Sequence, residues 1–175
     1  DIVVTEIFAD PEPLVGLPSF EFIEIYNRSE HAFDLAGWKL SDGTSSAVFP
    51  SRTLLPGKYL ILTSAAAVNA FSTYGETLAL MNFPTFNNSD DRVILRHTTG
   101  RLVDSVYYKR NWYRDDDKGE GGWSLELIDP HNVCETSENW IASEHEKGGT
   151  PGHPNSVLAE KPDLTGPALV SAIPL

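Results

Sequence analysis

The sequence predicts an all-β fold, either a sandwich or a barrel, with one short helix. Short runs of apolar, β-branched and aromatic residues recur along the 175-residue chain, and turns rich in Pro, Gly, Asn and Asp separate them. Only one segment favours a helix. Many short strands with frequent turns are typical of packed sheets rather than of an α/β fold.

The predicted strands follow one another at short intervals along the first 128 residues. We expect them at residues 2–8, 20–26, 38–40, 59–63, 77–81, 92–97, 102–108 and 123–128. The clearest pair is the hairpin of residues 92–108, in which both arms alternate and Gly100 stands where a left-handed residue is wanted. In the strand at 20–26, Ile23 and Ile25 should face the core, with Glu24 on the opposite face.

The helix is expected at residues 64–71. Ser64 is a suitable N-cap, and a run of alanines follows it. The segment stops before Gly75, so we expect two turns at one end of the sheets.

Composition changes near Gly148. Residues 148–155 are rich in glycine and proline and should close the domain as an extended segment. We therefore predict one domain over residues 1–157. Residues 158–175 should form a linker and the start of a following domain, because the strand-like run 168–173 has no partner behind it.

The charge of the chain excludes several partners. It has 13 basic and 25 acidic residues, a formal net charge of -12. Such a chain repels phosphate backbones unless its basic residues are segregated, so we expect no nucleic-acid binding. No run approaches the length of a membrane span. The single cysteine, Cys134, allows no intrachain disulfide.

Several motifs resemble those of the lamin-tail domain family. They are EFIEIYN at 21–27, LAGWKLSD at 35–42, LPGKYL at 55–60 and the hairpin at 91–108. Three later motifs resemble the bacterial branch of that family and lie at 121–126, 139–140 and 149–156. The resemblance implies an immunoglobulin-like β-sandwich. Trp38, which follows Gly37, should then plug the core between two sheets.

The same resemblance suggests where such a domain works. The later motifs look like modules of large secreted bacterial proteins, in which this domain accompanies others. The chain has no heptad pattern and no basic nuclear-localisation run, which disfavours a nuclear lamin.

An acidic loop is the best candidate metal site. Asp115, Asp116, Asp117 and Glu120 are four carboxylates within six residues, and they could surround calcium, which prefers oxygen ligands. The spacing is not that of an EF-hand. A charge run on a loop is more often simply solvated, so calcium is the only cofactor considered and the alternative is none.

Aromatic residues after the hairpin form a second candidate site. Trp112 and Tyr113 follow Tyr107 and Tyr108, and exposed rings near polar groups can bind a glycan or a peptide. The alternative is that these rings pack against the loop at 115–123.

Catalytic arrangements are weakly indicated. Cys134 and His131 could form a dyad, but they occupy a loop, and a semi-buried thiol is the simpler interpretation. Glu21 and Glu24 are three apart on a strand, so they should point to opposite faces and cannot flank one glycosidic bond.

The sequence thus predicts a non-catalytic structural or interaction module of a larger secreted or cell-surface multidomain protein. Its partners would be neighbouring domains of the same polypeptide, with a protein or glycan ligand as a further partner. The alternative is a carbohydrate-binding module that uses Trp112 and Tyr113.

Overall fold

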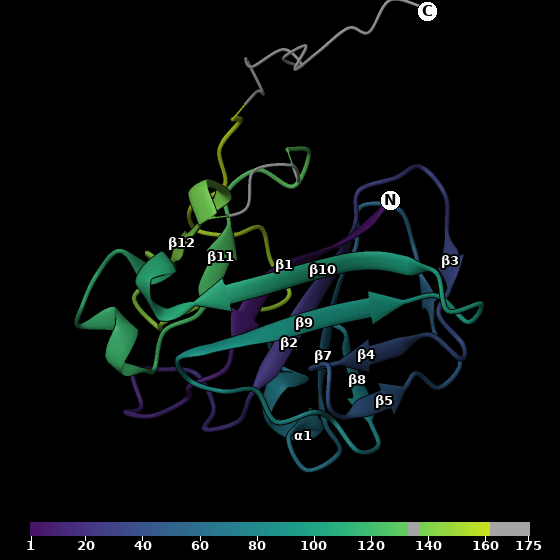
Figure 1. Ribbon diagram of the computed structural model, residues 1–175, viewed down its shortest axis with the longest axis horizontal. Coiled ribbons are helices and arrows are strands. Elements are labelled where there is room, and N and C mark those ends of the chain that lie inside the picture. The colour runs from purple at the N-terminus through teal and green to yellow at the C-terminus, as the bar shows by residue number, and fades with distance from the viewer. Residues whose placement is uncertain (133–136, 162–175) are drawn as a thin grey trace, which may run out of the picture.

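The computed structural model describes residues 1–132 and 137–161, which form a two-layer β-sandwich (Figure 1). One layer is a six-stranded sheet with the order β12-β11-β1-β2-β7-β8, and the other is a four-stranded sheet with the order β10-β9-β4-β5. The strands β3 and β6 form a separate pair. The predicted sandwich is confirmed.

The strands of the six-stranded sheet are β1 (Ile2–Phe8), β2 (Phe22–Asn27), β7 (Tyr59–Ser64), β8 (Thr77–Leu80), β11 (Leu125–Leu127) and β12 (Trp140–Ala142). Those of the four-stranded sheet are β4 (Lys39–Ser41), β5 (Ser46–Val48), β9 (Asp90–Arg96) and β10 (Leu102–Lys109), and the small pair is β3 (Phe33–Asp34) and β6 (Thr53–Leu54). Short 3-10 helices lie at η1 (Arg110–Tyr113), η2 (Lys118–Glu120) and η3 (Ser137–Asn139). Every predicted strand is present. β3, β5, β6 and β12 were not predicted, because two or three residues are too few to show an alternating pattern.

The predicted helix is shorter than expected. Helix α1 spans only Val68–Phe71, and no side chain caps its N-terminus. The assignment of Ser64 as N-cap is wrong, because Ser64 is the last residue of β7 and pairs with Leu80 of β8. Helix α1 belongs to the connection between β7 and β8, which are parallel.

The main core lies between the two sheets. Ile23 and Ile25 of β2 are fully buried in it, as the alternation predicts. A second apolar cluster lies on the other face of the six-stranded sheet, where α1 contributes Phe71. Both faces of this sheet are therefore covered.

Trp38 occupies the main core beside the rings of Phe33 and His97, with centroid distances of 6.2 and 5.5 Å. Gly37 before it has a φ of +75°, and a Cβ at that position would lie 3.0 Å from Cγ2 of Thr98. The left-handed backbone and this close approach both favour glycine. The prediction that Trp38 is buried is confirmed.

The C-terminal part of the described chain contacts the sandwich beyond the boundary expected at Val157. The backbone N–H of Ala159 donates to the carbonyl of Ile128, and the N–H of Lys161 donates to Asp129. The contacts thus continue to Lys161. The rest of the predicted linker and the strand-like run at 168–173 lie outside the described residues.

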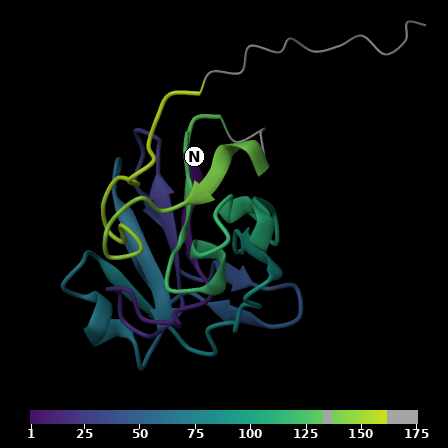
Figure 2. The same ribbon diagram turned by 90° about the vertical axis from the view of Figure 1, so that its left-hand side faces the viewer.

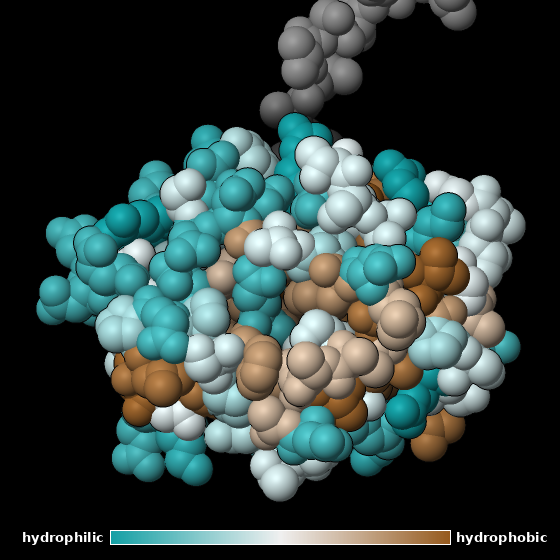
Figure 3. Space-filling model, turned by 90° about the horizontal axis from the view of Figure 1, so that it is seen from below, coloured by the Kyte–Doolittle hydropathy of each residue, from teal (hydrophilic) through white to brown (hydrophobic). Residues whose placement is uncertain are grey.

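The end of the sandwich that carries α1 exposes apolar side chains. Viewed from below, apolar residues lie near the middle of this face and also at its lower left and right, with hydrophilic residues between them (Figure 3). The exposed apolar side chains of the chain include Met81, Val48 and Phe20.

Replacing Trp38 by alanine should lower the free energy of unfolding by about 3–5 kcal/mol, since a large core side chain is lost and a cavity remains. Urea titration of the purified variant measures this. Met81→Ala is the matched control, because Met81 is 71% exposed and its loss should change stability little. A Trp38→Ala protein that unfolds at the wild-type urea concentration would refute the core assignment.

Candidate functional site

Three glutamates form a row across the outer face of the six-stranded sheet. The strand registers place Glu6 of β1 opposite Glu24 of β2 and opposite Glu126 of β11. All three side chains are fully buried. Carboxylates directly opposite one another on neighbouring strands repel when they are charged, so this row needs compensation.

The chain's own closing segment, residues 148–161, covers the row. Figure 2 shows this segment in yellow-green on the outer side of the six-stranded sheet. The N–H of Thr150 donates to Glu6 over 2.9 Å, and the N–H of Gly152 donates to Glu24 over 2.6 Å. The hydroxyl of Thr150 donates to Glu126 over 2.8 Å. Each carboxyl group therefore accepts a hydrogen bond from the same segment.

The sheet itself supplies further donors. The hydroxyl of Ser124 donates to Oε1 of Glu6, and the hydroxyl of Thr5 donates to Oε1 of Glu24. Thr5 lies at an irregularity in the pairing of β1 with β2. The other oxygen of Glu6, Oε2, is buried without a hydrogen-bond partner among residues 1–132 and 137–161.

Burial shifts the acidity of this row. Removal from water raises the pKa of Glu6 well above its ordinary value, and the neighbouring Glu24 and Glu126 raise it further. Burial raises the pKa of Glu24 to about 8, even though the hydrogen bonds from Gly152 and Thr5 oppose the rise. The raised pKa of Glu6 favours the neutral form, for which an unpartnered oxygen costs less than it would on a buried charge.

Gly149 allows the closing segment to lie directly on the row. A Cβ at this position would lie 2.5 Å from Oε1 of Glu6 and 2.7 Å from Cδ1 of Leu17. These neighbours are fully buried or nearly so and have no room to move. Glycine is therefore favoured at position 149 because the backbone lies in contact with Glu6, and not only because the chain turns here.

A groove of about 770 Å³ runs beside β10. Residues 104–107 and Lys109 line one side, and Trp112, Leu127 and Trp140 are among those that line the rest. Asp104 sits at one end, where its carboxylate accepts hydrogen bonds from the N–H groups of Val4 and Ser105. Asp104 therefore connects the edge of one sheet to β1 of the other.

Cations and an aromatic ring gather along this groove. The guanidinium of Arg92 and the ammonium of Lys109 lie 5.2 and 5.3 Å from the ring centre of Tyr107. Tyr107 is 43% exposed, and its hydroxyl donates to Asp90. Arg114 also lines the groove and lies 3.5 Å from Glu138. Such rings and cations can bind acidic or aromatic groups.

Of the two interpretations of Trp112 and Tyr113, an exposed platform or packed rings, the structure agrees with packing. They are only 9% and 4% exposed and belong to the main core. The reason is that η1 turns the chain back after β10 and packs against β12. Trp112 still borders the groove, but the exposed ring of this stretch is that of Tyr107. The alternation of β10 could have identified Tyr107, since it places Val106 and Tyr108 inside.

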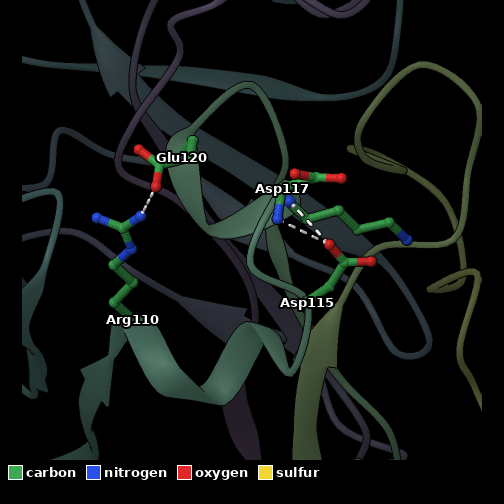
Figure 4. A network of polar contacts seen from close by, with 5 residues as sticks. Arg110, Asp115, Asp117 and Glu120 are labelled. Atoms are coloured by element: carbon green, nitrogen blue, oxygen red, sulfur yellow. Dashed lines mark hydrogen bonds and ion pairs between the residues drawn. The ribbon is translucent and has the colours of Figure 1, made fainter.

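The predicted calcium ligands do not converge on one point. One oxygen of Asp115 accepts hydrogen bonds from the N–H groups of Asp117 and Lys118, whereas Glu120 pairs with Arg110 (Figure 4). In the part of the chain that the structure describes, no group of three or more His, Cys, Asp or Glu residues could hold a metal ion. Asp116, like the others, remains only a sequence-based candidate.

The structure describes one of the two catalytic arrangements considered from the sequence, the pair Glu21 and Glu24, but only part of the other, the pair Cys134 and His131. Glu21 accepts a hydrogen bond from the N–H of Phe86, and burial raises its pKa to about 7. Glu24 instead contacts Gly152 in the closing segment, so the two glutamates do not share a site. Cys134 lies outside the described residues. The N–H of His131 donates to Asp129.

Comparison with known proteins identifies one family. The model of the family described as Lamin Tail Domain matches residues 1–110. A search of curated proteins found no match. The match includes Glu6 and Glu24 but ends before Glu126 and the closing segment. None of the helices in the described ranges is long and apolar enough to cross a membrane.

Replacing Gly149 by alanine should lower the free energy of unfolding by about 2–3 kcal/mol, because the added methyl group overlaps Glu6 and Leu17. Denaturant titration measures the loss. Gly119→Ala is the control, since a Cβ there meets its nearest atom, Nε of Arg110, at 3.4 Å. Equal stability of the two variants would contradict the close contact at Gly149.

The raised pKa values of Glu6 and Glu24 should make stability fall as pH rises. The pKa of Glu24 is about 8 in the folded state against 4.5 for an ordinary glutamate, so its protonated form favours folding. This contribution is complete below the unfolded pKa and is lost as the pH rises towards 8, with a slope on the order of 1 kcal/mol per pH unit.

Unfolding free energies measured from pH 5 to pH 8 test this prediction. Glu24→Gln should make the slope shallower by about 1 kcal/mol per pH unit, whatever its overall stability, because the amide does not titrate, whereas Glu6 and Glu21, whose pKa values are also raised, keep their contributions. Asp116→Asn, at an exposed position, should leave the slope unchanged. A wild-type protein that gains stability over this range would contradict the raised pKa values of Glu6 and Glu24.

Proposed function

This chain belongs to the lamin tail domain family, and on that premise we propose that it is an interaction and spacing module of a larger secreted or cell-surface protein. The family consists of non-enzymatic, immunoglobulin-like domains. In such a module the fold presents a binding surface and holds the neighbouring domains at a fixed distance from each other. Its partners would then be neighbouring domains of the same polypeptide.

The observation that carries this proposal is the enclosure of the most strongly shifted carboxyl groups. Glu6 and Glu24 have raised pKa values of the kind found in catalytic acids. Both are fully buried beneath the closing segment, so no substrate can reach them in this conformation. Their hydrogen bonds hold the domain together, which is a structural role.

The proposed context rests on two sequence features. The motifs at 121–126, 139–140 and 149–156 resemble those of secreted bacterial proteins. The last of them is the segment that covers the glutamate row. The net charge of -12 favours solubility and disfavours nucleic acid as a partner.

A second candidate function is carbohydrate binding. The exposed ring of Tyr107 and the edge of Trp112 both line the groove beside β10. Aromatic faces beside polar groups are suited to sugar rings. A glycan array with the 175-residue chain distinguishes this function from protein interaction.

Deleting residues 1–161 from the parent protein tests the proposed function. We expect the neighbouring domains to keep their own activity per molecule but to lose their retention at the cell surface or their correct spacing. Cell fractionation and immunoblotting measure the retention. The Trp38→Ala parent, whose domain is destabilised, should behave like the deletion. A parent confined to the cytosol, or a neighbour inactivated by the deletion, would contradict the proposal.

A further inference from the structure

The strand β10 is the outer strand of its sheet, and only alternate residues of its backbone form hydrogen bonds with the neighbouring strand β9. The N–H of Arg110 donates to the carbonyl of Ser89, which fixes the phase of the antiparallel pairing. In such a ladder alternate residues bond to the neighbouring strand. Val106 and Tyr108 therefore bond to β9, whereas Tyr107 and Lys109 direct their N–H and C=O groups outward along the groove.

The two halves of this edge differ in how they are protected. At Ser105, the side chain of Asp104 occupies the N–H group and also bonds to Val4. An inward-pointing charge of this kind blocks strand pairing. At Tyr107 and Lys109, no backbone partner is present on the outer side within the described ranges. β10 has eight residues, whereas the edge strands β5 and β12 have three each.

The surroundings of this edge have two chemical characters. On the core side, Val106, Trp112 and Trp140 offer apolar contacts. On the outer side, Tyr107 lies between the cations of Arg92 and Lys109. A strand laid along β10 would direct alternate side chains to these two sides.

We propose that an extended peptide with alternating apolar and acidic side chains binds this groove by adding a strand to β10. Main-chain hydrogen bonds to Tyr107 and Lys109 would provide affinity, and the two sides of the groove would provide selectivity. The proposal deepens the interaction role proposed above and rests on it, because it names the partner's chemistry.

Charge supports an acidic partner. Arg92, Lys109 and Arg114 line the groove together with Asp104 and Glu138, and Arg114 is paired with Glu138. Arg92 and Lys109 are therefore the two cations beside Tyr107, whose hydroxyl donates to Asp90, while backbone N–H groups already engage Asp104. The chain as a whole carries a charge of -12 and repels acidic segments elsewhere. An acidic peptide is therefore directed to this groove rather than spread over the surface.

The test uses the 175-residue chain and a capped ten-residue peptide in which valine and glutamate alternate. Fluorescence anisotropy measures binding, and the matched probe replaces each glutamate by lysine. Amide hydrogen exchange then reports the contact. The peptide should slow exchange at Tyr107 and leave Val106 and Tyr108 unchanged, since those two are already bonded to β9.

Two sets of variants separate backbone from charge. Tyr107→Pro removes the outward N–H without removing a bond to β9, whereas Tyr107→Thr keeps it. Proline should weaken binding about tenfold relative to threonine, the effect of one hydrogen bond. Arg92→Glu with Lys109→Glu should weaken binding at least about tenfold, and added salt should then strengthen the remaining binding instead of weakening it, because it screens the new repulsion. Thermal unfolding confirms that each variant is folded.

Four outcomes would overturn the proposal. The first is that the lysine probe binds as tightly as the glutamate peptide, and the second is that the proline and threonine variants bind the peptide equally. The third is that a glycan protects the amide of Tyr107 while the peptide does not. The fourth is that a dimer of the chain occupies the edge of β10 and excludes the peptide. None of them affects the parent-protein deletion test, so failure of this inference is distinguishable from failure of the proposed function.

Discussion

The burial of three carboxyl groups in one row is the constraint on which the rest of the structure depends. Glu6, Glu24 and Glu126 stand side by side on adjacent strands and are fully buried. Exposed to water they would repel one another, and buried without donors they would be costly. The closing segment resolves both problems by excluding water and supplying N–H and O–H groups, and burial raises the pKa values of Glu6 and Glu24. The glycine at 149 and the chain direction to Lys161 both follow from this arrangement.

The same arrangement explains why the family match does not mark the full extent of the folded unit. Residues 1–110 contain two carboxyl groups of the row and most strands of both sheets. They lack β11, which carries Glu126 and lies beside β1, and they lack the segment that covers the row. The matched part alone would expose buried acids and one side of β1. Contacts with the sandwich therefore continue well beyond the matched part, to Lys161.

The sequence predicted those strands and buried faces that depend on a local alternating pattern. It did not predict the burial and pairing that depend on residues distant in the chain. Alternation placed Ile23 and Ile25 in the core and Glu24 on the other face, and it located both arms of the β9–β10 hairpin. It gave no sign that Glu24 is buried, because the donor that covers it, Gly152, lies 128 residues away. The sequence left open whether Trp112 and Tyr113 are exposed or packed, since no local pattern reveals that η1 turns back towards β12. The two-residue strands β3 and β6 form only because distant segments meet.

The hydrogen bonds of the closing segment also constrain the order of folding. They join Glu6 to Thr150 and Thr5 to Asn155, at sequence separations of 144 and 150 residues. Contacts this distant slow folding, because nearly the whole chain must be ordered before they form. During synthesis the first strands leave the ribosome long before the segment that covers their acids. The domain therefore completes its fold only after residues 148–161 are made, and until then the acids of β1 and β2 lack the donors that cover them.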